Sequence, residues 1–267
     1  MKSCHFILLI DDLRLQCLTH KYVDDTTLTE LLPRGSSESQ MQLHFQDLRD
    51  WTTYNKMKIN YIKTKEMILV PLAKSPPDLL SHSSTTDVSV VIERVKSFKL
   101  LGINISHDFS WQTHVDVITS KAASRLHFLR ILKKSGLNPQ HLLHFYLSVI
   151  CPVLEYCSVF WHHGLSKTQC ESLEAIQCHA LRIIFLVTVG MPYILALGYA
   201  QTSSLHSRHE EANKRFSGTC LTLSLVFSPY CLHPETALLL LESDLQQSTL
   251  VQLLEQNVLH LRSNTIC

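Results

Sequence analysis

Two adjacent carboxylates, Asp24 and Asp25, follow Tyr22 and Val23 near the start of the chain. Neighbouring side chains on an extended strand point to opposite faces, whereas a tight turn brings both into one cleft. Carboxylate oxygens are ligands that Mg²⁺ prefers, and paired metal ions can clamp the attacking and leaving oxygens of phosphoryl transfer. Because turns also favour Asp for structural reasons, the pair alone indicates either a magnesium site or a solvated turn.

Two runs of basic residues could contact phosphate groups. The first consists of Lys56, Lys58, Lys63 and Lys65. The second, which no acidic residue interrupts, consists of Lys121, Arg125, Arg130, Lys133 and Lys134. Contacts between basic side chains and phosphates need no recognition of the bases. The runs predict either a nucleic-acid-binding surface or a solvated helix face.

Two further spacings suggest metal ligands. His114 and Asp116 have the H-x-D spacing of the iron-binding triad in 2-oxoglutarate oxygenases, with His162 as the third ligand. Thiolates and imidazoles suited to zinc occur at Cys157, His162, His163, Cys170, Cys178 and His179. With 16 His in the chain, chance spacings are common, and the zinc set has no close pairs. We therefore favour buried free thiols over a metal centre.

The elements of the first hundred residues follow from the pattern of apolar side chains. Residues 6–32 predict two strands whose connecting turn carries the Asp pair. A helix is expected from about Ser37 to Thr53, because Met41, Phe45 and Leu48 recur at helical spacing. Strands are expected over 63–70, with a basic entrance, over 88–92, and over 98–105 with a bend at Gly102; residues 71–87 are expected to form a loop.

Beyond residue 108 the apolar period changes from two to about 3.6. A stripe from Val115 to Leu132 predicts an amphipathic helix that Gly136 ends. Asn138 and Pro139 predict a capped second helix, which Pro152 kinks or ends. A capping box at Ser166 and Gln169 predicts a third helix. Further helices are expected over 208–216 and 236–261.

Composition narrows the class of protein. The chain has 267 residues, 45% apolar and 18% charged, and a formal net charge of +1, which excludes a disordered tail and a globally basic nucleic-acid coat. Nine Cys without a C-x-x-C pair, and no secretory signal, predict reduced thiols without disulfides in the cytoplasm or nucleus. We expect no membrane partner, because no apolar stretch approaches about 20 residues.

Several ordered blocks together resemble the reverse transcriptase of non-LTR (LINE-type) retrotransposons. They include His20–Leu28, Asn55–Asn60, Lys63–Lys65, Phe98–Ile103 and Pro152–Cys157. The similarity runs from about residue 6 to about residue 216. Short stretches of the thumb in that family are in turn similar to segments of AlkB-like proteins.

The resemblance implies an α+β fold in three parts. Residues 1–107 would form a partial palm, with antiparallel strands, packed helices and a hairpin like the one that grips the primer. Residues 108–190 would form a helical thumb-like region. Residues 191–267 would form a helical C-terminal segment.

The resemblance also implies RNA-directed DNA synthesis on an RNA or DNA template–primer. Asp24 and Asp25 would be the catalytic ligands of Mg²⁺, and Tyr22, Lys63 and Lys65 would lie near the nucleotide. The thumb-like helices would contact the nucleic-acid backbone through the second basic run, Lys121, Arg125, Arg130, Lys133 and Lys134.

A complete enzyme of this type has further parts before the hairpin, and we do not expect them here. Only 21 residues lie before Tyr22, too few for the fingers and for the palm strand that supplies a further catalytic Asp. We therefore expect a truncated remnant that is inactive alone. The alternative is a non-enzymatic module that binds nucleic acid or protein through the thumb-like helices. Uncovered strand edges of a truncated palm predict self-association.

Overall fold

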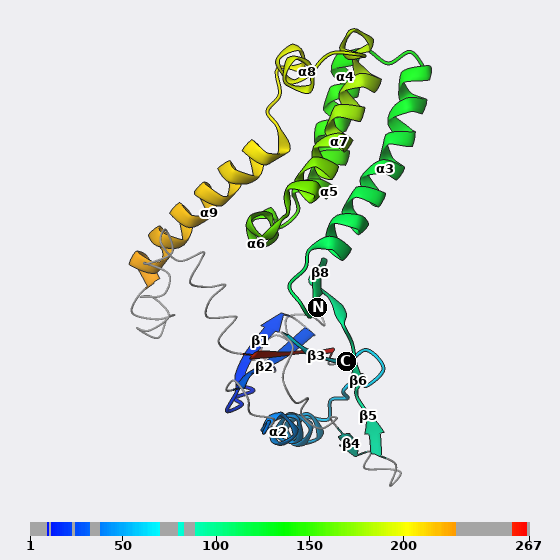
Figure 1. Ribbon diagram of the computed structural model, residues 1–267. Helices are drawn as coiled ribbons and strands as arrows, with labels where there is room; N and C mark the ends of the chain where they lie inside the picture. Colours follow the sequence, from blue (N-terminus) through cyan, green and yellow to red (C-terminus); the bar gives the residue numbers. More distant parts are fainter. Residues whose placement is uncertain are drawn as a thin grey trace. The chain divides into compact units, whose positions relative to one another are not determined.

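The computed structural model describes residues 10, 12–22, 25–32, 38–69, 80–82, 89–227 and 258–265 (Figure 1). The chain divides into two compact units between Ser110 and Trp111, and strand 258–265 belongs to the first. Strands and one long helix make up the described part of the first unit, and helices make up that of the second. The expected α+β class is therefore confirmed.

A five-stranded sheet forms the centre of the first unit. Its strands, in spatial order, are β1 (Leu18–Tyr22), β2 (Asp25–Leu32), β9 (Val258–Thr265), β3 (Lys65–Ile68) and β6 (Glu93–Arg94). Strands β1 and β2 form the expected hairpin, in which Tyr22 pairs with Asp25. The first strand of the hairpin begins at Leu18, later than the apolar pattern suggested.

Strand β9 corrects the helix expected over 236–261. Residues 258–261 are extended, because the backbone of β9 pairs on one side with β2 and on the other with β3. Leu261, for example, lies opposite Thr29 on β2 and opposite Met67 on β3. Pairing on both edges satisfies the backbone hydrogen bonds of a leucine-rich segment without a helix. The rest of that predicted helix lies outside the described residues.

Helix α2 (Met41–Tyr54) confirms the helix expected in this region. Met41, Phe45 and Leu48 are buried on its inner face and pack with Leu28 of β2. The carboxylate of Glu30 accepts hydrogen bonds from the Ser39 hydroxyl at 2.6 Å and from the Gln40 backbone at 2.8 Å. The start of the helix is thus tied to the sheet.

Two short hairpins complete the first unit. Strand β4 (Leu80–His82) pairs with β5 (Ser89–Val91), so three residues of the expected loop 71–87 are in fact a strand. Strand β7 (Ser97–Leu100) pairs with β8 (Ile103–Ser106). Leu101 and Gly102 both have positive φ, as a two-residue hairpin turn requires, so the expected bend is a full reversal of the chain.

The second unit is helical. Its longer helices are α3 (Gln112–Lys134), α7 (Lys167–Ile184) and α9 (Leu205–Phe227). Between and beside them lie α4 (Pro139–Phe145), η1 (Tyr146–Ile150), α5 (Cys151–Glu155), α6 (Ser158–Trp161), η2 (His162–Gly164), η3 (Leu186–Thr188) and α8 (Tyr193–Ala200). The amphipathic helices expected from 115, 138, 166 and 208 are all present (Figure 1).

The helix ends follow the expected local chemistry. Gly136 has φ +82° just after α3. The Asn138 side chain accepts the Gln140 backbone N–H at 2.9 Å, and Ser166 with Gln169 forms the capping box of α7. Pro152 lies at the start of α5, directly after the π-helical turn η1. Because proline has no N–H, a change of helical register at this point is expected.

The stretch Pro139–Gly164 is long and apolar enough, by length and composition alone, to cross a membrane. We had expected no such stretch. Its apolar side chains account for much of the core of the second unit, since Leu142, Tyr146, Ile150, Leu154 and Trp161 are buried against α3 and α7. The core of a soluble protein gives the same composition. The cytoplasmic or nuclear setting stays a prediction.

Candidate nucleic-acid interface

The second basic run does not form one face of helix α3. At about 100° of rotation per residue, Lys121 and Arg125 lie within roughly 40° of each other on one flank of the helix. Arg130 and Lys134 lie within roughly 40° of each other on the opposite flank. The buried stripe between the flanks includes Ile118, Ala122, Leu126 and Leu129. Four residues of one run in the sequence therefore divide into two groups, and the fifth, Lys133, lies on the side of the buried stripe.

Two members of the run hold helices together. The guanidinium of Arg125 is half-buried and donates to the carbonyl of Val149 in η1. The ammonium of Lys133 donates to the carbonyl of Ile183, one of the last carbonyls of α7. A cation at this end of a helix satisfies a carbonyl that has no partner within the helix and complements the helix dipole.

Arg130 contacts α7 at a histidine. Its Nη2 lies 2.7 Å from Nε2 of His179. Because a guanidinium can only donate, Nε2 must accept and the imidazole is neutral. Arg182 lies three residues further along α7, where side chains of a helix are neighbours. Partial burial lowers the pKa of His179, and the positive charges of Arg130 and Arg182 lower it further.

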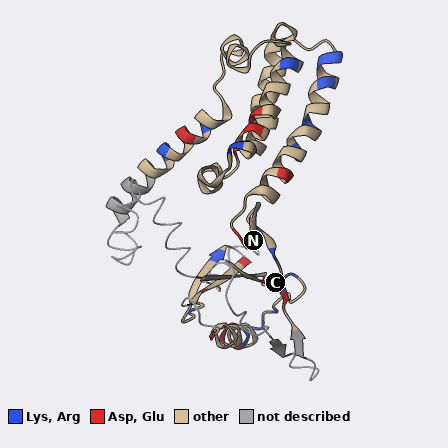
Figure 2. Cartoon of the chain, in the orientation of Figure 1, with Lys and Arg blue, Asp and Glu red and all other residues tan. Residues whose placement is uncertain are grey.

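We call the group Arg130, Lys133, Lys134, His179 and Arg182 the α3–α7 basic surface. Figure 2 shows that Lys and Arg gather where α3 and α7 end, with the acidic residues of both helices further from this end. Neither residues 117–154 nor residues 175–209 contain any Asp or Glu. Among the described residues, Arg130, Lys134 and Arg182 form no ion pair with a carboxylate. The surface is therefore positively charged and locally uncompensated.

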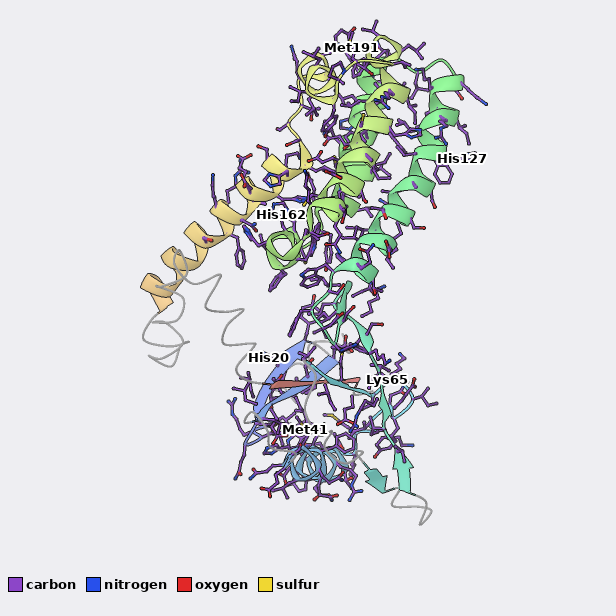
Figure 3. The ribbon with its side chains drawn as sticks, viewed as in Figure 1. His20, Met41, Lys65, His127, His162 and Met191 are labelled. Carbon is purple, nitrogen blue, oxygen red and sulfur yellow. The ribbon has the colours of Figure 1, made fainter. Side chains whose placement is uncertain are left out.

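The outer face of α3 lies between the two flanks. Phe128 is 57% exposed and Ile131 46% exposed, and His127 is exposed beside them. The rings of His127 and Phe128 are in edge contact, with centroids 6.0 Å apart. Figure 3 shows His127 projecting from α3 on the side away from the other helices.

A second concentration of ionisable side chains lies where α9 begins. His162 and His209 are buried, and their Nδ1 atoms lie 3.2 Å apart. Only one of the two nitrogens can carry a hydrogen in such a contact, so the pair cannot be doubly protonated without rearrangement. Burial lowers the pKa of both side chains, that of His209 to about 4. These imidazoles are structural and neutral at pH 7.

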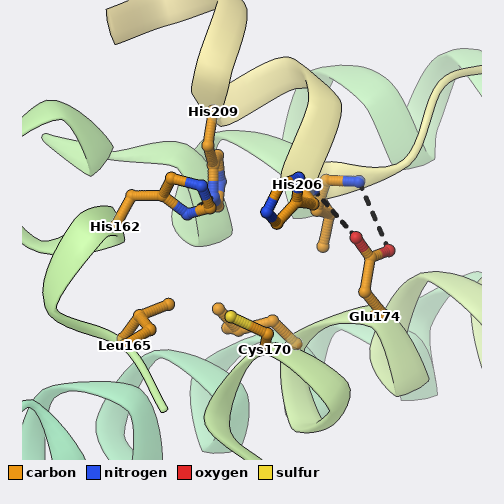
Figure 4. Close-up of a pocket in the computed structure, with 8 residues that line it drawn as sticks. His162, Leu165, Cys170, Glu174, His206 and His209 are labelled. Carbon is orange, nitrogen blue, oxygen red and sulfur yellow. Dashed lines mark hydrogen bonds between the residues drawn. The ribbon is translucent and has the colours of Figure 1, made fainter. Parts of the chain in front are cut away.

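Figure 4 shows His162, His206 and His209 on one side of a small cavity, with Leu165 and Cys170 on the other. The cavity measures about 10 Å³, room for roughly one water molecule. Glu174 turns to the start of α9, where its carboxylate accepts the backbone N–H groups of Leu205 at 3.3 Å and His206 at 2.8 Å.

The described residues contain no group of three or more His, Cys, Asp or Glu that could hold a metal ion. The H-x-D spacing is not an iron site here, because His114 and Asp116 point about 200° apart on α3. His114 is buried with its ring 5.3 Å from that of Trp161, while Asp116 is exposed and accepts a hydrogen bond from Gln112 at 2.7 Å. Burial and the charge of Lys121 lower the pKa of His114.

Cysteines are only partly buried. Cys151 is buried, and burial raises the pKa of its thiol to about 11. Cys157, Cys170 and Cys178 are partly exposed. Buried thiols in place of a zinc site were expected at Cys157, Cys170 and Cys178, and for these three cysteines the expectation is wrong.

The hairpin of β1 and β2 in the first unit carries part of the predicted nucleotide site. Asp25 begins β2, and Tyr22 opposite it is exposed, while Asp24 lies outside the described residues. Lys65 forms an ion pair with Glu93, whereas Lys63 is exposed. A phosphate-binding role for Lys65 would have to compete with that carboxylate. The magnesium ion, Tyr22 and the two lysines as parts of a nucleotide site stay predictions.

Comparison with known families gives a match inside the second unit. Residues 111–150 match the family described as alkylated DNA repair protein alkB homolog 8, N-terminal. The matched segment spans α3, α4 and η1, and contains all five residues of the second basic run. No curated protein and no solved structure matches the chain.

This match corrects the family expected from the sequence. The resemblance to a non-LTR reverse transcriptase is wrong, because the matching family is one of alkylated DNA repair. RNA-directed DNA synthesis and the truncated polymerase remnant fall with it, whereas the division into a palm and a thumb-like region stays a prediction. The blocks behind the resemblance are short, and amphipathic helices with basic flanks occur in many folds.

Sequence reasoning missed two residues of the basic surface, His179 and Arg182. A usable signal was present, since residues 175–209 lack acidic residues just as 117–154 do. What the sequence could not show is that the C-terminal ends of α3 and α7, which belong to these two stretches, lie side by side.

Proposed function

We propose that the second unit binds nucleic acid through the α3–α7 basic surface, within a protein that acts in nucleic-acid repair or modification. The proposal concerns binding and assigns no catalytic residue. Its ligand is the phosphate backbone, which basic side chains contact without reading sequence.

The arrangement of Arg130, His179 and Arg182 carries this proposal. Two guanidinium groups flank one imidazole, and no carboxylate of the described residues offsets their charge. Gathering like charges is unfavourable over distances shorter than the Debye length, about 8 Å at physiological ionic strength. An anionic ligand relieves that repulsion, and a phosphate accepts two hydrogen bonds from one guanidinium.

The family match supports the same class of ligand. The name of the matching family refers to repair of alkylated DNA, and the matched residues include Lys121, Arg130 and Lys134, the exposed cations of α3. The family match therefore includes the part of the α3–α7 basic surface that lies on α3, whereas His179 and Arg182 on α7 lie outside the matched residues.

The test is binding of the full chain to a fluorescently labelled RNA strand at low and moderate salt. In the double variant Arg130→Gln and Arg182→Gln, we expect affinity to fall about tenfold or more, roughly 1.4 kcal/mol. Arg215→Gln is the matched control, because Arg215 is also exposed in the second unit but pairs with Glu211. Equal affinity of the double variant and the control would reject the proposal.

A further inference from the structure

We propose that the outer face of α3, next to the α3–α7 basic surface, makes binding specific for single-stranded nucleic acid. Phe128 would be the side chain on which a base stacks. This inference rests on the proposed function and names the form of nucleic acid that the site takes.

Phe128 lies on the outer face of α3, about 20° from Lys121 and about 160° from Arg130 around the helix. Relative to Lys121, the directions of Phe128 and Ile131 lie roughly 340° and 280° around α3, and that of Arg130 roughly 180°. The outer face therefore carries Phe128 and Ile131, with Lys121 on one edge and Arg130 and Lys134 on the other. A strand lying along this face would meet Lys121 on the side of Phe128 and Lys134 on the side of Ile131.

Exposure of Phe128 needs a physical reason. More than half of this side chain is in water, and Ile131, one turn away on the same face, is nearly as exposed. An apolar group that stays in water forgoes the favourable free energy of burial in proportion to its exposed area. A base that covers the ring removes this apolar surface from water, and stacking on the aromatic ring adds a further favourable contribution.

The neighbouring ring favours a pre-organised platform. His127 holds an interplanar angle of 67° to Phe128 at a centroid distance of 6.0 Å, which is an edge-to-face contact. Restricting the Phe128 side chain before binding lowers the entropy lost when a base stacks on it. The contact also leaves Phe128 largely exposed.

A duplex does not fit this face as well. In a double helix the flat faces of the bases are already stacked on one another, so they are not available to a ring on a protein surface. Single strands can turn a base outward, and every base offers a π face, so such binding tolerates any sequence. Backbone contacts alone would not distinguish the two forms.

The experiment compares the full chain, Phe128→Leu and Phe216→Leu on a labelled RNA strand and on the same strand annealed to its complement. Leu keeps an apolar side chain but removes the ring. Phe216 is the matched control, because it is also an exposed phenylalanine, 49% accessible, in contact with another ring, that of Phe160 on α6. We expect Phe128→Leu to weaken single-strand binding about fivefold or more and to leave duplex binding unchanged. Phe216→Leu should change neither.

A second variant reports stacking directly. In Phe128→Trp, the added indole should lose fluorescence on addition of the single strand and not on addition of the duplex. Equal affinity of the wild-type chain for both forms, or an equal loss on both forms in Phe128→Leu, would overturn the inference. If Phe128→Leu instead abolishes dimerisation of the protein alone, measured by sedimentation, the face is a contact between copies and the inference is also overturned.

Failure of this inference can be separated from failure of the proposed function. Loss of binding in the Arg130→Gln and Arg182→Gln double variant together with full binding in Phe128→Leu rejects stacking and keeps the basic surface. No dependence on the two arginines rejects the basic surface itself.

Discussion

The second unit contains two concentrations of ionisable side chains that differ in how their charges are matched. At the start of α9, Arg208 forms a two-pronged ion pair with Glu155, and Glu174 accepts hydrogen bonds from α9 and from the Tyr193 hydroxyl. At the ends of α3 and α7, Arg130, Lys134 and Arg182 have no carboxylate partner among the described residues. Matched charges dock one helix on others, whereas unmatched charges are available to a ligand.

This difference separates stability from binding. Substitutions at the start of α9 should lower the free energy of unfolding, and substitutions on the α3–α7 basic surface should lower affinity for nucleic acid. The four predictions below follow that division, from the largest expected change in stability to the smallest.

Acidification should give the largest effect. The pKa of His209 is about 4 in the folded chain and 6.5 in the unfolded chain, because burial first and then the nearby His162 disfavour the charged form. A lowered pKa stabilises the fold above pH 6.5, and that contribution disappears as pH falls from 6.5 to about 4. The full loss is about 3 kcal/mol, most of it above pH 5. The pKa of His162 is also lowered, so its contribution has the same sign.

Trp161 offers the readout, since its ring lies 5.2 Å from that of His209. The free energy of unfolding is measured at pH 7 and at pH 5 by denaturant unfolding, followed by Trp161 fluorescence. The other tryptophans of the chain are replaced by Phe for this measurement. His209→Leu should flatten the pH dependence. That variant keeps the other ionisable groups that face His162 and His209, which are His163, Glu174, His206, Arg208 and Glu210. An unchanged pH dependence would show that His209 does not titrate as described.

Removal of the guanidinium at the start of α9 should give the next largest effect. In Arg208→Gln, the Glu155 carboxylate loses both hydrogen bonds from Arg208, which should lower the free energy of unfolding by about 2 kcal/mol. Arg215→Gln breaks an exposed pair and should change it by less than about 0.5 kcal/mol. Chemical denaturation of both variants checks the difference, and equal losses would contradict it.

Removal of the charge on Glu174 should have a smaller effect. Glu174→Gln keeps one acceptor oxygen but removes the negative charge at the N-terminus of α9, where the helix dipole favours an anion. We expect a loss of about 1 kcal/mol, measured by thermal unfolding. A loss as large as that of Arg208→Gln would mean that the carboxylate does more than cap the helix.

The double variant Arg130→Gln and Arg182→Gln should change the free energy of unfolding by less than about 0.5 kcal/mol, in contrast to its effect on binding. The pKa of His179 should rise in this variant, because two positive charges that lower it are gone. An NMR titration of the His179 ring measures that rise. No change in this pKa would show that the arginines lie too far from His179 to create the positive field.

Local chemistry explains which parts of the fold the sequence predicted. Asn138 and Ser166 with Gln169 act on backbone groups two or three residues away, so the sequence determined these helix starts. The hairpin around Asp25 and the buried face of α2 follow from short-range apolar patterns in the same way. Strand β9 was missed because its conformation depends on two distant strands.

The same contrast applies to the candidate site. Arg130 and His179 are 49 residues apart, and Arg208 and Glu155 are 53 apart, so no local pattern reveals either pairing. The second basic run was visible in the sequence, but its division over two flanks follows from helix geometry. Arg125 and Lys133 proved to bind carbonyl groups of neighbouring helices.

The salt dependence of binding tests the central claim most directly. For the full chain and a labelled RNA strand, log Kd is measured against log salt concentration, with and without Arg130→Gln and Arg182→Gln. Each phosphate contact that is lost should reduce the magnitude of the slope by about 0.7, so the double variant should have a clearly shallower slope than wild type and than Arg215→Gln. Equal slopes for the three proteins, or no binding by wild type at low salt, would contradict the account.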